Sequence, residues 1–415
     1  MNIFLLVWNY LKAKPLNTAL NILLLALGIA VIVVLLLFSK QLEEKINENA
    51  RGIDLVVGAK GSPLQLILCN IFHIDFPTGN INLAEAERIA KNRLVKKAIP
   101  LALGDSYQAY RIIGTNQEYG ELYKAELEQG EWFTHELEVT LGANVAAMAK
   151  LKLGDEFASA HGLTMGGHAH EEHNFVVKGI LKKSNTVLDN LILTSVESVW
   201  HVHDLHTDED HADHTSDTSF VASSLVPSTA AGDSTKEITA LLIQYRSAMG
   251  AIQLPRIVNG QTSLQAASPA FETARLFSIL GVGVDILMAF AYVLIFISAL
   301  SIFIALYNSL KERRYDLAIM RSMGATRLKL VVSILTEGIL LTLLGSTIGI
   351  LLGHGVVLLM TGLVEETQKA GISGIVFYTE EWIILAGSLL LGVVCALLPA
   401  WQAYRTDISK VLAGN

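Results

Sequence analysis

The stretch KERRYDLAIMRSMGATRLKL, residues 311–330, decides how this chain is organised. It contains six basic and two acidic residues, and it lies between two long apolar stretches. A basic segment in that position is typical of a short loop between two membrane spans on the cytoplasmic side. Gly324 suits the end of a helix and Thr326 the start of the next, so the stretch predicts a short helix, a break and a second helix.

The rest of the chain is apolar enough to belong in a membrane. Hydrophobic residues make up 52% of the 415 residues, and the mean hydropathy is +0.45, more than one soluble core needs. A span needs about 20 mainly apolar residues to cross roughly 30 Å of hydrocarbon. The sequence predicts four spans, at residues 16–38, 277–310, 330–359 and 382–401.

The first of these stretches has an alternative interpretation as a cleaved signal peptide, because Lys12 and Lys14 precede it. Its apolar run is longer than the usual run of about 7 to 15 residues, and SKQLEEK follows it instead of a small-residue cleavage site. We therefore expect a retained anchor.

The basic residues near the span ends predict the orientation. They cluster before the first span, in residues 311–330 and in the tail, whereas the loop between the third and fourth spans is net acidic. Both termini are then cytoplasmic. The net charge of the whole chain is −8 and the cytoplasmic segments are net positive, so the acidity falls on the outer side, which argues against nucleic acid as a partner.

The predicted organisation follows from these assignments. Residues 1–39 hold the cytoplasmic N-terminus and first span, 40–275 an extracytoplasmic domain, 276–310 the second span and a stalk, 311–329 a cytoplasmic segment, 330–360 the third span, 361–381 a short outer loop, 382–401 the fourth span and 402–415 a cytoplasmic tail. The second span is long enough to project beyond the bilayer, hence the stalk.

The sequence of the extracytoplasmic domain has the helix and strand patterns of a globular α+β fold. AEAERIAKN predicts an amphipathic helix, and FVVKGIL and LDNLILTSV predict short strands. We expect two α+β lobes. Only Cys69 falls in this domain, and Cys395 lies in the fourth span, so no disulfide is expected. The fold class is an α-helical membrane protein of four spans with a large α+β domain between the first and second.

Histidine is concentrated in two loops of that domain, at residues 158–174 and 201–219, which flank the two predicted strands. Nine of the twelve histidines lie between residues 161 and 214. Imidazole and carboxylate groups are zinc ligands, so the loops predict a zinc site. We expect His168 with His170, and His201 with His203, to share one side of an extended segment. The candidate ligands are His168, His170, His173, His201, His203, His206, His211 and His214. The alternative is a polar loop that binds metal adventitiously.

The spans themselves contain few polar groups. Asp285, Glu337 and His354 are the ionisable residues well inside them, too few to predict a hydrophilic conduit. Gly345, Gly349 and Gly353 repeat every four residues, which lets another helix approach closely. That helix belongs either to a second copy, at a dimer seam, or to the same chain.

Three segments carry a resemblance to a known family. RRYDLAIMRSMGATRLKLVVSILTEGILLTLLGSTIGILLGHG, residues 313–355, resembles the hallmark segment of FtsX-like, MacB-type ABC transporter permeases of type VII. The tail PAWQAYRTDISKVLAGN and the first span WNYLKAKPLNTALNILLLALGIAVIVVLLL are similar to the ends of that family. The order of one span, a large outer domain and three spans is also the family's.

The resemblance implies a homodimeric inner-membrane permease worked by a separate cytoplasmic ABC ATPase, which would bind ATP and Mg²⁺. The chain contains no G-x-x-x-x-G-K-[ST] motif, and GAKGS at residues 58–62 lacks the lysine and the Ser/Thr in the required positions. We therefore expect no ATP hydrolysis by this chain alone. The family's coupling helix corresponds to residues 310–323. The implied contacts to the ATPase are Glu312, Arg314, Asp316 and Arg321, together with Met320 and Met323, which we expect to share an adaptable apolar face. A plain charged turn at the headgroups is the alternative.

Members of the family are thought to transmit nucleotide-driven motion to the outer domain, a mechanism called mechanotransmission. Three functions are compatible with such a permease. The histidines favour a role in envelope zinc handling with a periplasmic partner. The alternatives are an efflux or lipoprotein-release permease and a regulator of a cell-wall hydrolase.

Overall fold

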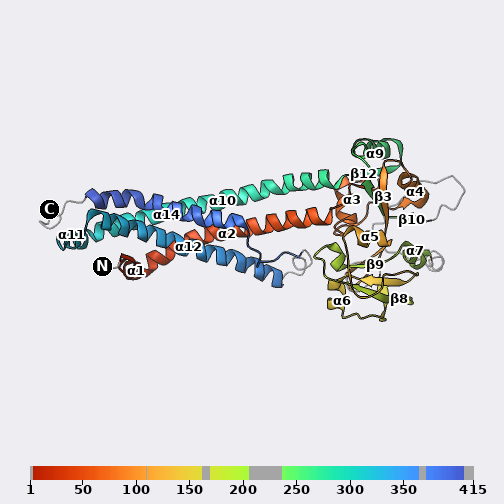
Figure 1. Cartoon of the computed structure of the whole chain (residues 1–415), viewed down its shortest axis with the longest axis horizontal. Helices are drawn as coiled ribbons and strands as arrows, with labels where there is room; N and C mark the ends of the chain where they lie inside the picture. Colours follow the sequence, from red (N-terminus) through yellow and green to blue (C-terminus); the bar gives the residue numbers. More distant parts are fainter. Residues whose placement is uncertain (1–2, 109, 161–168, 205–235, 364–370, 406–415) are drawn as a thin grey trace, which may run out of the picture. The chain divides into compact units, whose positions relative to one another are not determined.

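A computed structural model describes residues 3–108, 110–160, 169–204, 236–363 and 371–405 (Figure 1). The chain divides into two compact units. A helical unit comprises Met1–Glu43 and Ile279–Asn415, and an α+β unit comprises Glu44–Ser278.

The helical unit contains four helices that are long and apolar enough to cross a membrane, as the sequence predicts (Figure 1). Two short helices accompany them. In chain order the helices are α1 (Ile3–Ala13), α2 (Pro15–Asn49), α10 (Pro269–Glu312), α11 (Arg314–Ser322), α12 (Arg327–Leu363) and α14 (Thr379–Arg405).

Each long helix extends beyond the apolar run that predicts it. α2 continues for eleven residues past residue 38, and α10 spans 44 residues, or about 65 Å. Both begin with a proline, which is favoured at the first position because its missing N–H has no partner there in any case. α2 and α10 are unbroken helices at residues 43–44 and 278–279, where the chain passes from one unit to the other.

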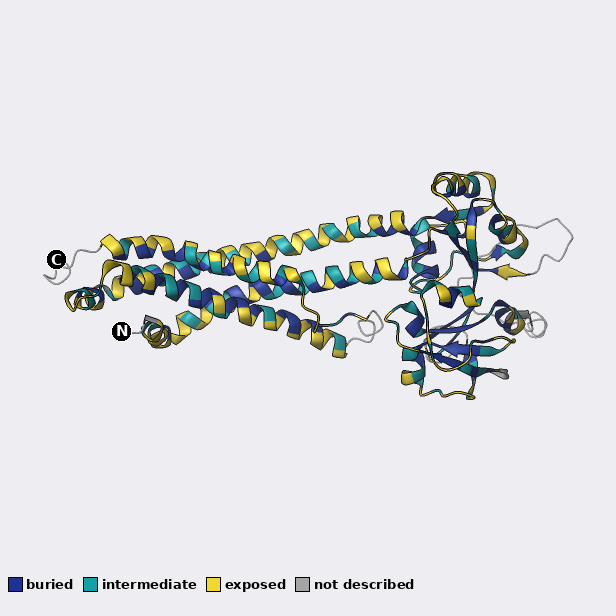
Figure 2. Ribbon diagram, viewed as in Figure 1, coloured by how far each residue is buried: buried dark blue, intermediate teal, exposed yellow. Residues whose placement is uncertain are grey.

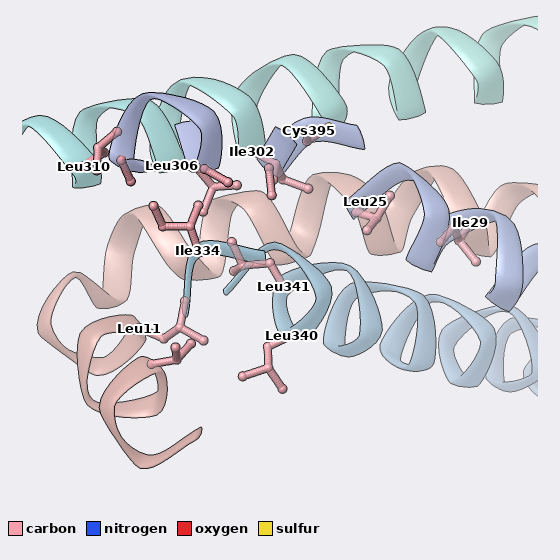
Figure 3. Close-up of a cluster of buried hydrophobic side chains, with 14 of the residues drawn as sticks. Leu11, Leu25, Ile29, Ile302, Leu306, Leu310, Ile334, Leu340, Leu341 and Cys395 are labelled. Carbon is pink, nitrogen blue, oxygen red and sulfur yellow. The ribbon is translucent and has the colours of Figure 1, made fainter. Parts of the chain in front are cut away.

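The core of the helical unit lies between α1, α2, α10, α12 and α14 (Figure 3). Leu25 and Ile29 of α2 face this core, and Ile302 of α10 and Leu341 of α12 are also buried in it. The opposite faces of the same helices are exposed and apolar (Figure 2), with Phe296 70% exposed. An apolar surface of this extent marks contact with lipid or with another protein.

The α+β unit is built on one sheet with the strand order β12-β1-β11-β3-β4-β9-β6-β8-β5, and β7 pairs with β3 and β8. Neighbours are antiparallel except for β4 with β9 and β6 with β8. The strands are β1 (Leu55–Ala59), β3 (Val95–Tyr107), β4 (Tyr110–Thr115), β5 (Leu127–Gly130), β6 (Glu138–Leu141), β7 (Glu156–Ala160), β8 (Ala169–Leu181), β9 (Leu191–Ser195), β11 (Ala240–Tyr245) and β12 (Leu264–Ala267); β2 (Ile81–Asn82) and β10 (Glu237–Ile238) form a separate pair.

Helices cover this sheet and complete its cores. They are α3 (Pro63–Asn70), α4 (Leu83–Ala90), α5 (Gln117–Leu122), α6 (Ala143–Ala149), α7 (Val196–Asp204) and α9 (Ala248–Gln261), with a short 3₁₀ turn at Val187–Asn190. The predicted helix at AEAERIAKN is α4, and the Asn82 side chain caps it by accepting a hydrogen bond from the Ala84 N–H at 2.9 Å.

The long strand β3 connects the two halves of the sheet in the α+β unit, and the expected division into two lobes stays a prediction. One part of β3 pairs with β11 and another part with β4, so the sheet is continuous through it. The two predicted strands are present as part of β8 and as β9, but they are not neighbours, because β6 pairs with both and lies between them.

Candidate functional site

The segment between α10 and α12 forms the expected short helix and break. Arg313 interrupts the helical path between α10 and α11, and Gly324 ends α11 with a φ of +98°, which glycine adopts without strain. The N–H groups of Gly324 and Ala325 bond back to carbonyls of α11 at 3.0 Å. Thr326 Oγ1 then accepts the Lys329 N–H at 3.4 Å at the start of α12.

One face of α11 packs on the helical core and the other faces outward. Leu317 and Ala318 are buried, and Met320 is half-buried against the core. Tyr315, Ile319 and Met323 are exposed, Met323 by 84%. We call these three residues the α11 stripe; their spacing of four residues aligns them along one side of the helix.

The expectation that Met320 and Met323 share one outward face is therefore wrong. Residues three apart lie about 60° apart around a helix at 100° per residue, and the edge of the core passes between these two. Tyr315 and Ile319 were missed by the sequence reasoning, although their spacing of eight and four residues from Met323 was a readable signal.

The charged residues around α11 differ in their surroundings. Glu312 forms an ion pair with Lys14, which links the end of α10 to the junction of α1 and α2. Asp316 is exposed and Arg321 is half-buried. The side chain of Arg314 lies outside the described part of the chain. Contacts of these residues with an ATPase stay a prediction.

A partly buried ion pair lies next to α11. Arg313 Nη1 donates to Glu337 Oε2 of α12 at 3.2 Å, and the side chains are 16% and 9% exposed. The Arg313 guanidinium also lies 3.6 Å from the centre of the Tyr10 ring of α1. Sequence reasoning singled out Glu337 as an ionisable residue inside a span, but it did not identify this partner.

A polar cavity of about 210 Å³ adjoins this ion pair. Asn21 Oδ1 accepts a hydrogen bond from Ser301 Oγ at 2.5 Å on its wall, between α2 and α10. The Arg313 side chain thus contacts α1 through Tyr10 and α12 through Glu337, so one side chain connects the start of α11 to both helices.

The three glycines of α12 face α2 of the same chain. A Cβ at Gly345 would lie 2.8 Å from Leu25, and one at Gly349 would lie 2.8 Å from the carbonyl oxygen of Ala26. A Cβ at Gly353 would lie 2.7 Å from the side chain of Val33. We call Gly345, Gly349 and Gly353 the glycine ridge. In the structure the helix that approaches this ridge belongs to the same chain and not to a second copy.

The predicted histidine ligands are only partly within the described residues. His170 and His173 belong to strand β8, and His201 and His203 belong to helix α7. His201 and His203 therefore do not lie on one side of an extended segment as expected. His168, His206, His211 and His214 lie outside the described residues.

The described parts of the chain contain no group of three or more His, Cys, Asp or Glu side chains placed to hold a metal. Within them, His201 Nδ1 lies 3.8 Å from Glu136 Oε2, and both side chains are exposed.

Family models match both parts of the chain. The model for the MacB-like periplasmic core domain matches residues 18–245, more than half of the chain, and the model for the FtsX-like permease C-terminal matches residues 288–408. The chain belongs to the MacB/FtsX family of ABC transporter permeases. The predicted fold class and the membrane location with a large periplasmic-type domain are confirmed.

Two relatives share parts of the permease sequence. The uncharacterized ABC transporter permease YknZ of Bacillus subtilis is 32% identical over 108 residues, which cover 25% of each chain. The macrolide export ATP-binding/permease protein MacB of Syntrophobacter fumaroxidans is 27% identical over 122 residues, 29% of this permease and 16% of that protein. The matches thus span a quarter or less of each relative.

Two solved structures were also matched, each at 14% identity. The periplasmic region of MacB from Actinobacillus actinomycetemcomitans gives a TM-score of 0.34, covering 56% of the permease and 97% of that chain. The extracellular domain of YknZ from Gram-positive bacteria gives a TM-score of 0.29, covering 52% and 99%.

Proposed function

We propose that this chain is a membrane subunit that couples ATP hydrolysis by a separate cytoplasmic ATPase to motion of its extracytoplasmic unit. The observation that carries the proposal is the α11 stripe, an exposed apolar row on the short helix between two spans. The family assignment to ABC transporter permeases supports an ATPase as the partner. ATP and Mg²⁺ would bind there, and this chain would take no catalytic part.

The α11 stripe has the chemistry of a helix that docks into a groove. Residues spaced by four supply the apolar contact, and a flexible methionine adapts to the shape of the groove. Asp316 and the basic residues nearby would set the orientation, because charges at an interface act mainly on specificity and association rate.

The helices on either side of the docking segment provide a route for motion. Arg313 connects α11 to α12 through Glu337 and to α1 through Tyr10. α2 and α10 are continuous helices that contribute residues to both units. A tilt of either helix at its cytoplasmic end would therefore be transmitted along a rigid rod, which is mechanotransmission without a conduit.

Co-expression with the cognate ATPase tests the proposal. The wild-type chain is expected to co-purify with the ATPase, and Ile319→Asp to abolish the complex because a carboxylate would be buried at the docking surface. Leu363→Asp is the matched control, since Leu363 is 76% exposed at the opposite end of α12. Equal recovery of ATPase with Ile319→Asp and with wild type would remove the docking assignment.

We propose further that two copies of the chain form the working permease, with one ATPase each. The glycine ridge of α12 is occupied by α2 and so does not supply the seam. Exposed apolar faces of the span helices remain available for it (Figure 2). Mass photometry of the chain in nanodiscs is expected to give a dimer, and a monomer would contradict this part of the proposal.

A second candidate function is the handling of lipid-like substrates, as in efflux or lipoprotein release. An apolar groove of about 540 Å³ lies between α2, α10 and α14, a volume usual for ligand sites. Its walls include Ile29, Met288 and Leu391. Such a groove would accept an alkyl chain from the bilayer.

Filling the groove tests this candidate. A Cβ at Gly387, which lines the groove, meets nothing within 4 Å, so Gly387→Phe adds bulk there without a backbone clash. Gly355→Phe is the matched control, because a Cβ there also meets nothing within 4 Å and Gly355 does not line the groove. Photolabelling by a diazirine fatty acid should fall only in Gly387→Phe; equal labelling of both variants would reject the site.

A role in zinc handling, with an extracytoplasmic protein as partner, stays a proposal that rests on the nine histidines between residues 161 and 214. Zinc titration of the full chain is expected to show stoichiometric binding that weakens below about pH 6, where imidazoles protonate. Binding should be lost when His201, His203 and His206 become Ala. Weak binding that falls in proportion to the histidines removed would indicate adventitious metal. Regulation of a cell-wall hydrolase is a further alternative.

A further inference from the structure

A buried imidazole and carboxylate meet at the extracytoplasmic end of the helical unit. His354 of α12 and Glu381 of α14 lie with Nε2 and Oε2 2.8 Å apart, and the side chains are 7% and 5% exposed. The family function proposed above does not require either residue.

Each remaining polar atom of the pair is bonded to the loop at residues 371–378, which precedes α14. His354 Nδ1 lies 2.7 Å from the Gly374 carbonyl oxygen, and Glu381 Oε1 accepts the Tyr378 N–H at 2.9 Å. The Phe377 ring stacks on the imidazole, with ring centres 4.2 Å apart. The pair therefore holds this loop at three points.

The same loop is bonded to α2. Gln41 Nε2 donates to the Ser373 carbonyl oxygen at 2.8 Å, and the Ser373 N–H donates to Gln41 Oε1 at 2.7 Å. Next to it, Lys40 forms an ion pair with Glu380 of α14 at 3.0 Å. The loop thus ties together the outer ends of α2, α12 and α14, and α2 is one of the two helices that continue into the other unit.

The hydrogen-bond partners indicate how many hydrogens the pair needs. The Gly374 carbonyl can only accept, so His354 Nδ1 carries a hydrogen. A hydrogen bond between Nε2 and Oε2 also needs one hydrogen, carried either by an imidazolium or by a carboxylic acid. In both forms the pair holds one proton more than a neutral imidazole beside a carboxylate.

We propose that His354 and Glu381 form a binding site for one proton, and that release of this proton to the extracytoplasmic solvent opens the loop at residues 371–378. On release, the Nε2–H or Oε2–H bond breaks, the electron pair stays on that atom, and the proton passes to water. A lone pair of Nε2 then faces a carboxylate oxygen 2.8 Å away, and two buried polar atoms lose their partner. The site therefore links external proton concentration to the outer ends of α2, α12 and α14.

At this end of the surrounding elements, the other ionisable groups in the described residues include Lys40, Glu43 and Glu44 of α2, Tyr378 of the loop and Glu380 of α14. Lys40 and Glu380 are paired with each other, and their side chains are 41% and 39% exposed. An isosteric change at Glu381 separates the pair from these neighbours, because all of them are retained in that variant.

A spin label on the loop tests the proposal in the full chain in nanodiscs. Ile375, which is 73% exposed, is changed to Cys for labelling, and the two buried cysteines, Cys69 and Cys395, are changed to Ala. As the pH is raised over the range in which the chain stays folded, the label is expected to pass from immobile to mobile. The mobile-to-immobile ratio should rise about tenfold per pH unit through the transition, as release of one proton requires.

Glu381→Gln is expected to keep the label immobile throughout, because its amide N–H can donate to Nε2 of a neutral imidazole and its oxygen can accept the Tyr378 N–H. His354→Ala is expected to leave the label mobile throughout. A label at Leu390, 65% exposed on α14, should not respond to pH. A constant signal at residue 375 in the parent chain, the same titration in Glu381→Gln, or a parallel change at residue 390 would each overturn the proposal.

Discussion

Arg313 Nη1 lies 3.2 Å from Glu337 Oε2 and so connects the start of α11 to the interior of α12. The two residues are 24 positions apart in the chain and share the wall of one polar cavity. The pair gives the docking segment a second connection to the spans besides the covalent one through α10.

Breaking this ion pair from one side should destabilise the helical unit. Glu337→Ala leaves the Arg313 guanidinium partly buried without its carboxylate, at a cost of about 1–3 kcal/mol. Arg313→Ala should cost a similar amount, and it also removes the contact with Tyr10. The loss of stability in the double variant should be smaller than the sum of the losses in the two single variants, because neither charge is then left buried without its partner. The free energy of unfolding in detergent would be measured for the wild type, the two single variants and the double variant. Strictly additive losses would show that the two side chains do not interact.

Filling the glycine ridge should separate α2 from α12. A Cβ at Gly349 would lie 2.8 Å from a backbone oxygen of α2, which cannot move as a side chain can, so Gly349→Ala should cost about 1–3 kcal/mol. Gly355→Ala is the control on the same helix, where a Cβ meets nothing within 4 Å and the change should stabilise by up to about 1 kcal/mol. Thermal unfolding in detergent should move the two variants in opposite directions; a shared direction would contradict the close packing of these helices.

The α+β unit should lose stability on acidification through His73. Burial, with the nearby positive charge of Arg111, lowers the pKa of His73 from 6.5 to about 3. The unfolded chain therefore binds a proton that the folded chain does not between about pH 6.5 and 3, and stability falls as pH falls, with a slope of up to about 1.4 kcal/mol per pH unit. His73 has a φ of +55°, which asparagine tolerates, so His73→Asn keeps the turn and should flatten the slope. Denaturant unfolding followed by tryptophan fluorescence over that pH window checks this. Identical slopes in the two proteins would show that His73 is not the titrating group.

The spans, the outer domain and the helix–break–helix at residues 311–330 could be predicted from sequence because each depends on local apolar runs and on single turn residues. The glycines at 345, 349 and 353 likewise predict a close approach, but not that α2 is the approaching helix. The face of α11 that turns outward was predicted wrongly, because the burial of Met320 is set by packing on the core of the helical unit and not by the helix itself.

The two buried pairs of the helical unit could not be predicted either. Glu337 and His354 stand out in the sequence as ionisable groups in apolar spans, which indicates that each needs a partner. Arg313 and Glu381 are two of many charged residues outside the predicted spans, and only the packing of the helices shows which of them reaches inward.

Site-specific photocrosslinking from α11 is the most direct measurement of the central claim, that the α11 stripe docks the ATPase. Benzoylphenylalanine would be placed singly at Ile319, at Met323 and at Met320 in the chain co-expressed with its cognate ATPase. The account predicts crosslinks to the ATPase from positions 319 and 323, whose side chains are exposed, and none from 320, which packs on the helical core. Crosslinks from 320 alone, or from none of the three, would contradict it.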